Sequence, residues 1–111
     1  SDLSIISPDQ RIYGDGVKPA SYGVAKAGVV NLTKYLSTYL AKKNIRVNSL
    51  SPAGVYNNQS NEFVSKFRDL IPMDRMAKPD EYKGAVVFMC SDASSFMTGH
   101  NLVIDGGRTI W

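Results

Sequence analysis

Tyr22 and Lys26 lie four positions apart in the segment Ser21-Tyr22-Gly23-Val24-Ala25-Lys26. Residues at this spacing in a helix share one face, so the two side chains are expected to be neighbours. An isolated tyrosine hydroxyl titrates near pH ~10, and an adjacent ammonium favours its phenolate form. The spacing of Tyr22 and Lys26 therefore predicts that the tyrosine hydroxyl exchanges a proton with an alcohol or a carbonyl near neutral pH.

The segment that must position this pair is a helix, predicted over residues 22–43. Its apolar residues recur at spacings of three and four, which predicts that one face packs against the rest of the molecule. These residues are Val29, Leu32, Leu36 and Leu40. A short run with two β-branched residues follows directly at 45–50. Pro52 prevents its continuation, so the run predicts a short buried strand. A helix followed by a strand after a tight turn is half of a βαβ crossover, so the sheet is expected to be parallel.

The remaining elements follow from the same signals. Residues 63–71 form an amphipathic pattern that stops at Pro72, residues 79–91 start with proline and acids as a helix does, and residues 100–104 read as a strand. Residues 1–20 carry proline, glycine, aspartate and serine and predict a loop. Two strands make a poor sheet, so we expect further strands ahead of residue 1.

The bulk properties exclude several classes of protein. The chain has 111 residues, enough for one domain, with 43% hydrophobic and 21% charged residues and no long apolar run, so no membrane association is expected. The net charge is +3, but the basic residues, Lys18 among them, are scattered between acids. This favours a solvated surface over nucleic-acid binding. The single cysteine, Cys90, is typical of a reduced, cytoplasmic protein.

Four motifs in order resemble the short-chain dehydrogenase/reductase family. They are its Tyr-x-x-x-Lys motif at Tyr22 and Lys26, its Arg-Val-Asn-x-x-x-Pro-Gly strand and turn at 47–52, its Arg-to-Pro-acid segment at 75–81, and its Thr-Gly to Asp-Gly-Gly ending at 98–107. The resemblance implies an α/β fold, the C-terminal part of a doubly wound parallel-sheet Rossmann-type fold. It implies an NAD(P)-dependent oxidoreductase that transfers hydride between a nicotinamide and an alcohol or ketone.

The resemblance also implies roles for single residues. Tyr22 would be the general acid/base and would also contact the cofactor, and Lys26 would lower the pKa of Tyr22 and bind the nicotinamide ribose hydroxyls. A serine orients the substrate oxygen in the family. Ser1 is the candidate because the first four residues resemble the end of the family's serine-bearing strand, with Ser4 and Ser7 as alternatives.

A second group of residues is implied to bind the cofactor. Pro52, Ala53, Gly54 and Val55 match the loop that holds the nicotinamide carboxamide, although Ala53 stands where the family usually has glycine. Asn57 falls where the family often has a threonine that contacts the cofactor. His100, the only histidine, has no cysteine or second histidine beside it, so we expect no metal site.

No glycine-rich turn between a strand and a helix occurs in the chain, so the choice between NAD and NADP stays open. We therefore expect residues 1–111 to be the C-terminal catalytic part of a single Rossmann-type domain whose dinucleotide-binding half is absent, and expect the isolated chain to be inactive. The alternative is a non-catalytic truncated fragment that acts as an oligomerisation module.

Residues 6–13 and 51–58 resemble relatives in bacterial surface-sugar and flagellin-modification pathways, which implies a small, sugar-derived alcohol or carbonyl as the substrate. The family resemblance further implies a homo-oligomer, a dimer or a tetramer, in which the long helix and the last helix with its strand form the interfaces.

Overall fold

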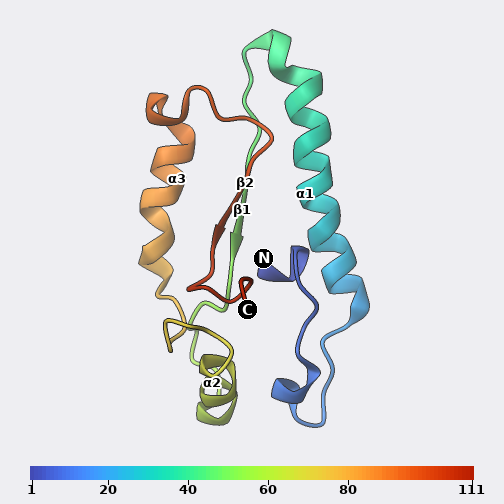
Figure 1. Ribbon diagram of the computed structural model, residues 1–111, viewed down its shortest axis with the longest axis vertical. Coiled ribbons are helices and arrows are strands. Elements are labelled where there is room, and N and C mark those ends of the chain that lie inside the picture. The colour runs from blue at the N-terminus through green and yellow to red at the C-terminus, as the bar shows by residue number, and fades with distance from the viewer.

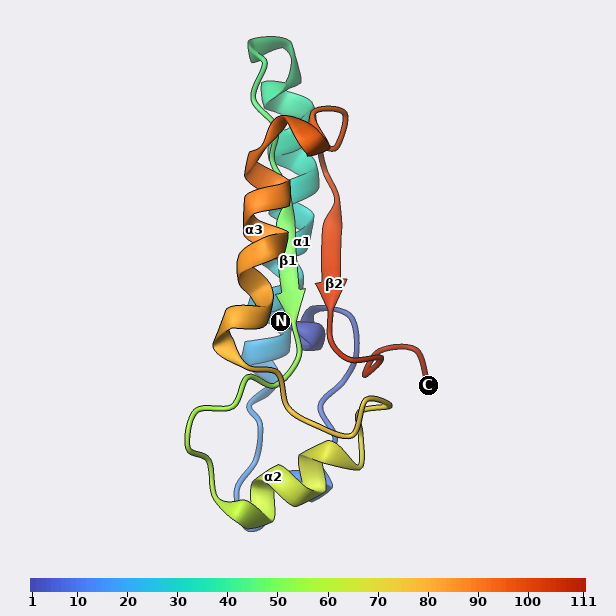
Figure 2. The same cartoon turned by 90° about the vertical axis from the view of Figure 1, so that its left-hand side faces the viewer.

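A parallel two-stranded sheet lies between two helices in the computed structural model, which describes residues 1–111 (Figure 1). Strand β1 (Ser49–Pro52) pairs with β2 (Asn101–Ile104) in a register that sets Ser49 opposite Asn101 and Pro52 opposite Ile104. Helices α1 (Ala20–Leu40) and α3 (Lys83–Cys90) cover opposite faces of this sheet (Figure 2). Helices on both faces are the usual setting of parallel strands, so the predicted α/β class with a parallel sheet is confirmed.

The shorter elements lie at the ends of these four. Helix α2 (Asn61–Arg68) stands apart from the sheet, beyond the ends to which the strands point (Figure 1). Five 3₁₀ turns complete the chain: η1 (Asp2–Ser4), η2 (Gln10–Tyr13), η3 (Ala41–Lys43), η4 (Pro79–Tyr82) and η5 (Asp92–Ser94). The predicted loop over residues 1–20 thus contains two short 3₁₀ turns.

Helix α1 exists as predicted, but its buried face is not the apolar one. Thr33 and Ser37 are its buried residues, whereas Val29 and Leu32 are 51% and 53% exposed. The reason is the close approach of the segment before β2, where a Cβ atom on Gly99 would lie 2.8 Å from the Ser37 hydroxyl oxygen. Only small side chains fit between α1 and this segment.

The prediction of a strand over residues 45–50 is wrong at both ends, because β1 begins at Ser49 and includes Pro52. The stretch before it is bound partly through side chains, and the Val47 carbonyl also accepts from the Gly99 N–H at 2.7 Å. Val47 donates its N–H to the Thr98 hydroxyl at 3.1 Å, and the Asn48 amide oxygen accepts from the His100 N–H at 3.0 Å. These contacts occupy the positions that ladder hydrogen bonds would take in a longer strand.

The helix expected over residues 79–91 is divided into the turn η4 and the helix α3. The Arg46 guanidinium, which precedes β1, fixes the C-terminal end of α3. It donates to the carbonyl oxygens of Met89 and Ser91 at 2.9 and 3.2 Å. A guanidinium satisfies carbonyls that a helix leaves without partners at its C-terminus. The arginine of the strand motif is therefore structural.

Few residues of the chain are buried for a chain of this length. Only 10 of 111 residues are buried, and the apolar ones, Ile12, Phe67, Ile71 and Met76, form one cluster between α2, η2 and the segment that follows α2. The radius of gyration is 15.6 Å, against about 13 Å for a compact domain of this size. The sheet and the helices α1 and α3 thus keep apolar surface exposed. No helix combines the length and the apolar character needed to cross a membrane.

Candidate active site

The chemistry-bearing residues gather at the end of the sheet to which both strands point. Helix α1 begins there, and the turn η1 and the tail that follows β2 lie at the same end (Figures 1 and 2). In open parallel sheets this carboxyl end is where ligands bind. The loop after β1, residues 52–57, leaves the sheet at the same place.

Tyr22 and Lys26 lie side by side in the first turns of α1. The Lys26 ammonium nitrogen is 5.3 Å from the centre of the Tyr22 ring, within the distance at which a cation and an aromatic ring attract each other. Both residues are partly buried, and Lys26 forms no ion pair with any acid of the chain. The sequence therefore places a phenol beside an ammonium that has no anionic partner in this chain.

The turn η1 packs against the same stretch of α1. The Leu3 carbonyl oxygen lies 3.5 Å from where a Cβ atom on Gly23 would stand, an ordinary van der Waals distance, so η1 and α1 are in direct contact at this point. Ser1 caps the turn: its hydroxyl accepts from the Leu3 N–H at 3.3 Å and donates to the Asp2 carboxylate at 3.1 Å.

The other two serines proposed from the sequence have different surroundings. The Ser4 hydroxyl lies 3.1 Å from the hydroxyl of Ser51, which in turn donates to the Asn101 amide oxygen at 2.8 Å. This chain of hydrogen bonds ties η1 to both strands. Ser7 is exposed. Ser1 caps η1 and Ser4 joins η1 to the strands, so both hydroxyls have partners within the chain.

The loop after β1 is hydrogen-bonded to neighbouring segments through some of its backbone groups, whereas other backbone N–H groups have no partner. Ala53 donates its N–H to the Ile104 carbonyl at 3.3 Å, and the Gly54 carbonyl accepts from the Ala77 N–H at 3.0 Å. A Cβ atom on Gly54 would lie 2.3 Å from the Phe67 ring, so this glycine is required by packing. The N–H groups of Gly54 and Val55 form no hydrogen bond within the chain.

Asn57 lies farther along the same loop and is exposed. Its backbone N–H donates to the Gln59 side chain at 2.7 Å, and the same side chain donates to the Val55 carbonyl at 2.9 Å. Gln59 thus fixes the course of the loop, and the Asn57 side-chain amide is left without a partner in the chain.

A cavity of about 190 Å³ opens beside this loop. Its lining includes Ala53, Gly54, Met73, Asp105 and Tyr82. The Tyr82 hydroxyl is buried and has no hydrogen-bond partner, and burial raises the pKa of this hydroxyl, with the Glu81 carboxylate adding to the rise. The cavity thus offers one unpartnered polar group within a largely apolar lining.

The sequence analysis assigned no role to two cations at this end of the sheet, Lys18 and Arg108. Lys18, expected on a solvated surface, is partly buried and places its ammonium 3.7 Å from the centre of the Tyr22 ring. Arg108 is buried on the tail after β2. Spacing was the available signal for Lys18, four residues before Tyr22, but that stretch is a loop, in which spacing does not define a face. No pattern marked Arg108.

The comparisons with known proteins cover nearly the whole chain. A family model described as enoyl-(acyl carrier protein) reductase matches residues 9–109. The chain is 41% identical to D-arabinitol 2-dehydrogenase (ribulose-forming) of Candida tropicalis, covering 100% of this chain and 42% of that protein. It is 36% identical to the post-translational flagellin modification protein A of Campylobacter coli, covering 96% of this chain and 43% of that protein.

A solved structure agrees with these relatives. The crystal structure of a short-chain dehydrogenase from Leptospira borgpetersenii with bound NAD⁺ superimposes with a TM-score of 0.93 at 41% identity, over 99% of this chain and 42% of that one. The chain thus spans about two fifths of the length of the proteins it matches. The sequence and fold comparisons agree that the chain belongs to the short-chain dehydrogenase/reductase family.

Proposed function

We propose that residues 1–111 carry the proton-transferring half of an NAD- or NADP-dependent oxidoreductase acting on an alcohol or a ketone. The observation that carries this proposal is the Tyr22 ring with the Lys26 ammonium 5.3 Å from its centre, at the carboxyl end of a parallel sheet. The relatives named as dehydrogenases, and the similar structure that contains NAD⁺, support the same chemistry.

The residues present fit a nicotinamide cofactor. Lys26 offers an ammonium without an anionic partner, which suits the hydroxyls of a ribose, and Gly54 and Val55 offer free backbone N–H groups, which suit the oxygen of a carboxamide. Pro52 and Ala53 set the course of this loop, and the unpartnered amide of Asn57 adds a further donor and acceptor. When bound, the nicotinamide supplies the site that accepts or donates the hydride.

Tyr22 would then handle the proton. In alcohol oxidation its phenolate takes the hydroxyl proton of the substrate, and in ketone reduction its hydroxyl gives that proton back. The Lys26 ammonium lies beside this phenol and would stabilise the negative charge that develops on its oxygen during proton transfer. Ser1 would turn its hydroxyl from Asp2 toward the substrate oxygen, a rotation about one side-chain bond.

We propose further that the chain is the C-terminal catalytic part of one Rossmann-type domain. The exposed apolar surface, the two-stranded sheet and the large radius of gyration all support a domain completed by other residues. Alone, residues 1–111 are expected to turn over no substrate, because they contain no turn that binds a pyrophosphate. An isolated chain that reduces NAD⁺ or NADP⁺ as fast as the full-length protein would refute this.

For the substrate we propose a small, sugar-derived alcohol or its carbonyl counterpart. The arabinitol dehydrogenase and the flagellin modification protein among the relatives support this class. We place the protein in the cytoplasm, which the single free thiol of Cys90 supports.

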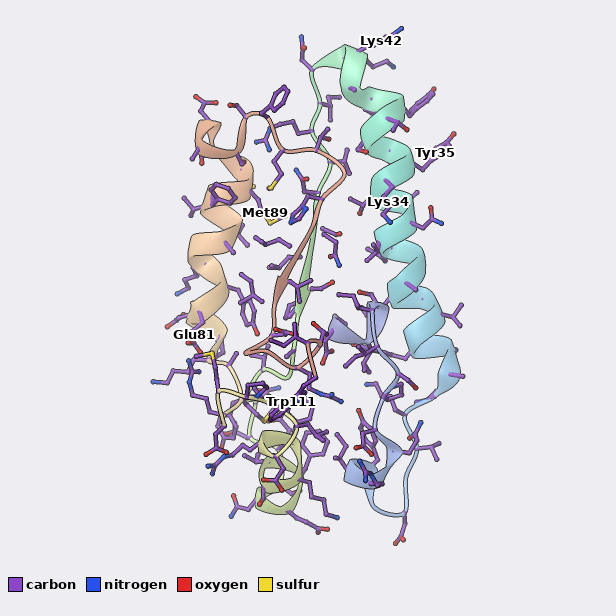
Figure 3. The ribbon with its side chains drawn as sticks, in the orientation of Figure 1. Lys34, Tyr35, Lys42, Glu81, Met89 and Trp111 are labelled. Atoms are coloured by element: carbon purple, nitrogen blue, oxygen red, sulfur yellow. The ribbon has the colours of Figure 1, made fainter.

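A second candidate function, self-association, is favoured by the exposed side of α1. Leu32 and the stacked pair Tyr35 and Tyr39, with ring centres 6.0 Å apart, are exposed, and Tyr35 points away from the sheet (Figure 3). We propose that this face joins copies of the full-length protein into a dimer or tetramer. Sedimentation of Leu32→Glu should show smaller particles, with Thr38→Glu as the control, and unchanged particles would argue against it.

The experiment that tests the enzymatic proposal compares two lysines of α1. In the full-length protein, Lys26→Met should lower kcat/KM for the alcohol roughly 100-fold, because the ammonium beside Tyr22 is lost. Lys34→Met is the matched control, since Lys34 lies on the same helix and is exposed (Figure 3). Equal activity in both variants would contradict the proposal.

A further inference from the structure

The ammonium of Lys18 lies over the face of the Tyr22 ring. Its nitrogen is 3.7 Å from the centre of the ring, whereas that of Lys26 is 5.3 Å away. A cation within about 6 Å of the centre of an aromatic ring is attracted by the negative face of that ring. Lys18 and Tyr22 are both partly buried, which weakens the screening of this attraction by water. The closer of the two cations on the proposed catalytic phenol therefore comes from the loop before α1.

Hydrogen bonds of the backbone fix the position of Lys18. The Gln10 side chain donates to the Lys18 carbonyl at 3.1 Å and accepts from the Lys18 N–H at 2.9 Å. Pro19 follows directly, with a φ of −60° and a ψ of 140°, and its carbonyl accepts from the Tyr22 N–H at 3.1 Å. Lys18 is thus restrained on one side by Gln10 and on the other by a proline whose carbonyl is bonded to Tyr22 itself.

The turn that contains Gln10 is anchored in the apolar cluster. Gln10 is the first residue of η2, and Ile12 of the same turn is 6% exposed and belongs to the cluster that includes Phe67. Contacts therefore run without a break from the core through η2 and Gln10 to the Lys18 backbone. The place of this ammonium over the ring is set by the packing of the loop, and the repeat of α1 has no part in it.

A cation on the face of the ring affects the phenol in two ways. It restrains the ring, and the hydroxyl must lie about 2.6–3.2 Å from the substrate oxygen for a proton to pass between them. A misplacement of about 1 Å can cost about 100-fold in rate. The attraction also grows as negative charge develops on the phenol, because opposite charges attract more strongly than a charge and a neutral ring. A contact that strengthens toward the transition state raises kcat.

We propose that Lys18 is a positioning residue of the reaction: its ammonium, placed by Gln10, holds the Tyr22 ring in the orientation in which the hydroxyl meets the oxygen of the alcohol. This inference rests on the proposed function, because Lys18 acts through the proton transfer proposed for Tyr22. It gives Lys18 a task that differs from that of Lys26, whose ammonium is proposed to bind the ribose of the cofactor.

The kinetic test uses the full-length protein with D-arabinitol and the oxidised cofactor that it accepts. Lys18→Met keeps the length of the side chain and removes its charge, and it should lower kcat about 5- to 20-fold while KM for D-arabinitol and for the cofactor changes less than about twofold. Lys18→Arg keeps a cation that stacks on aromatic rings and should restore kcat to within about threefold of the unmodified value. Lys42→Met, beyond the far end of α1, is the exposed control and should leave these constants unchanged (Figure 3).

A double variant tests the part of Gln10. Gln10→Ala alone should lower kcat, because Lys18 is no longer held over the ring. Since Gln10 acts through Lys18, adding Gln10→Ala to Lys18→Met should lower kcat by less than about a further twofold. Two effects that multiply would contradict the placement of Lys18 by Gln10.

A spectroscopic readout needs no turnover. In NMR spectra of protein with isotope-labelled lysine, the methylene protons beside the Lys18 ammonium should resonate upfield of those of Lys42, because they lie in the ring current of Tyr22. They should stay upfield in Tyr22→Phe, which keeps the ring, and lose the shift in Tyr22→Leu.

Three results would each overturn the inference: unchanged kcat in Lys18→Met, a loss that Lys18→Arg does not restore, or methylene protons of Lys18 that show no upfield shift. Turnover that survives Tyr22→Phe would instead refute the proposed function. The two failures are distinguishable, because the shift of the Lys18 protons reports the contact with the ring whether or not Tyr22 transfers the proton.

Discussion

The ammonium of Lys18 lies closer to the centre of the Tyr22 ring than that of Lys26, at 3.7 Å against 5.3 Å. The two lysines reach the ring by different routes. Lys26 is placed by the repeat of α1, whereas Lys18 belongs to the loop before the helix and depends on one side chain, Gln10, for its position. The environment of the proposed catalytic phenol is therefore set by a loop as much as by the helix.

Gln10→Ala should make the loop that carries Lys18 more flexible. Two hydrogen bonds are lost, each worth about 0.5–1.5 kcal/mol when it is intact. The Lys18 N–H then becomes accessible, and its hydrogen exchange should speed up by roughly tenfold or more. Gln59→Ala is the control, because Gln59 makes the same kind of clamp on the loop after β1. Equal exchange of the Lys18 N–H in the unmodified protein and in Gln10→Ala would contradict the clamp.

Gly54→Ala should destabilise the protein through packing. The new methyl would stand 2.3 and 2.6 Å from two carbon atoms of the Phe67 ring, so the ring or the loop must move. Overpacking of this kind costs about 1–3 kcal/mol in the free energy of unfolding. Gly84→Ala is the control: it adds the same methyl within α3, where no atom lies within 4 Å, and should be neutral or stabilising by up to ~1 kcal/mol. Urea unfolding of the two variants distinguishes these outcomes.

The ion pair between Arg75 and Glu81 should persist in acid. Hydrogen bonds from Arg75 and from the Lys78 N–H lower the pKa of Glu81 from 4.5 to about 2. A lowered carboxylate pKa gives stability that is complete above the unfolded value and is lost as the pH falls through the folded one. Between pH 4.5 and about 2 the pair should therefore weaken progressively. Carboxyl carbon NMR should give a Glu81 midpoint well below 4.5, and Arg75→Met should raise it part of the way, since the hydrogen bond from the Lys78 N–H remains; a midpoint near 4.5 in the unmodified protein would contradict the pair.

Local sequence signals predicted the elements better than their contacts. The spacing of Tyr22 and Lys26 defined a shared helix face, and the structure contains that juxtaposition. The buried positions of α1 were not predicted, because Ser37 packs against Gly99, which is far away in the chain. Periodicity reports which residues are apolar, and it contains no information about how closely another segment approaches.

The same limit applies to the candidate site. No local sequence pattern predicts that Arg108 is buried. Its burial depends on how the chain turns after β2. Arg46 and Asn48, which belong to the strand motif, bind backbone groups around the ends of α3 and β2 and so have structural roles. A motif marks a family, whereas the contacts of each residue show which members of the motif hold the fold.

The central claim is that Tyr22 transfers the proton. The most direct test is the kcat of Tyr22→Phe in the full-length protein at saturating cofactor, measured together with the affinity of this variant for the reduced cofactor. Removal of one hydroxyl takes away the proton donor and acceptor and leaves the ring in place. The account predicts that kcat falls by about 10²–10⁴-fold while cofactor affinity changes little. A Tyr22→Phe protein that turns over its alcohol at the unmodified rate would contradict it.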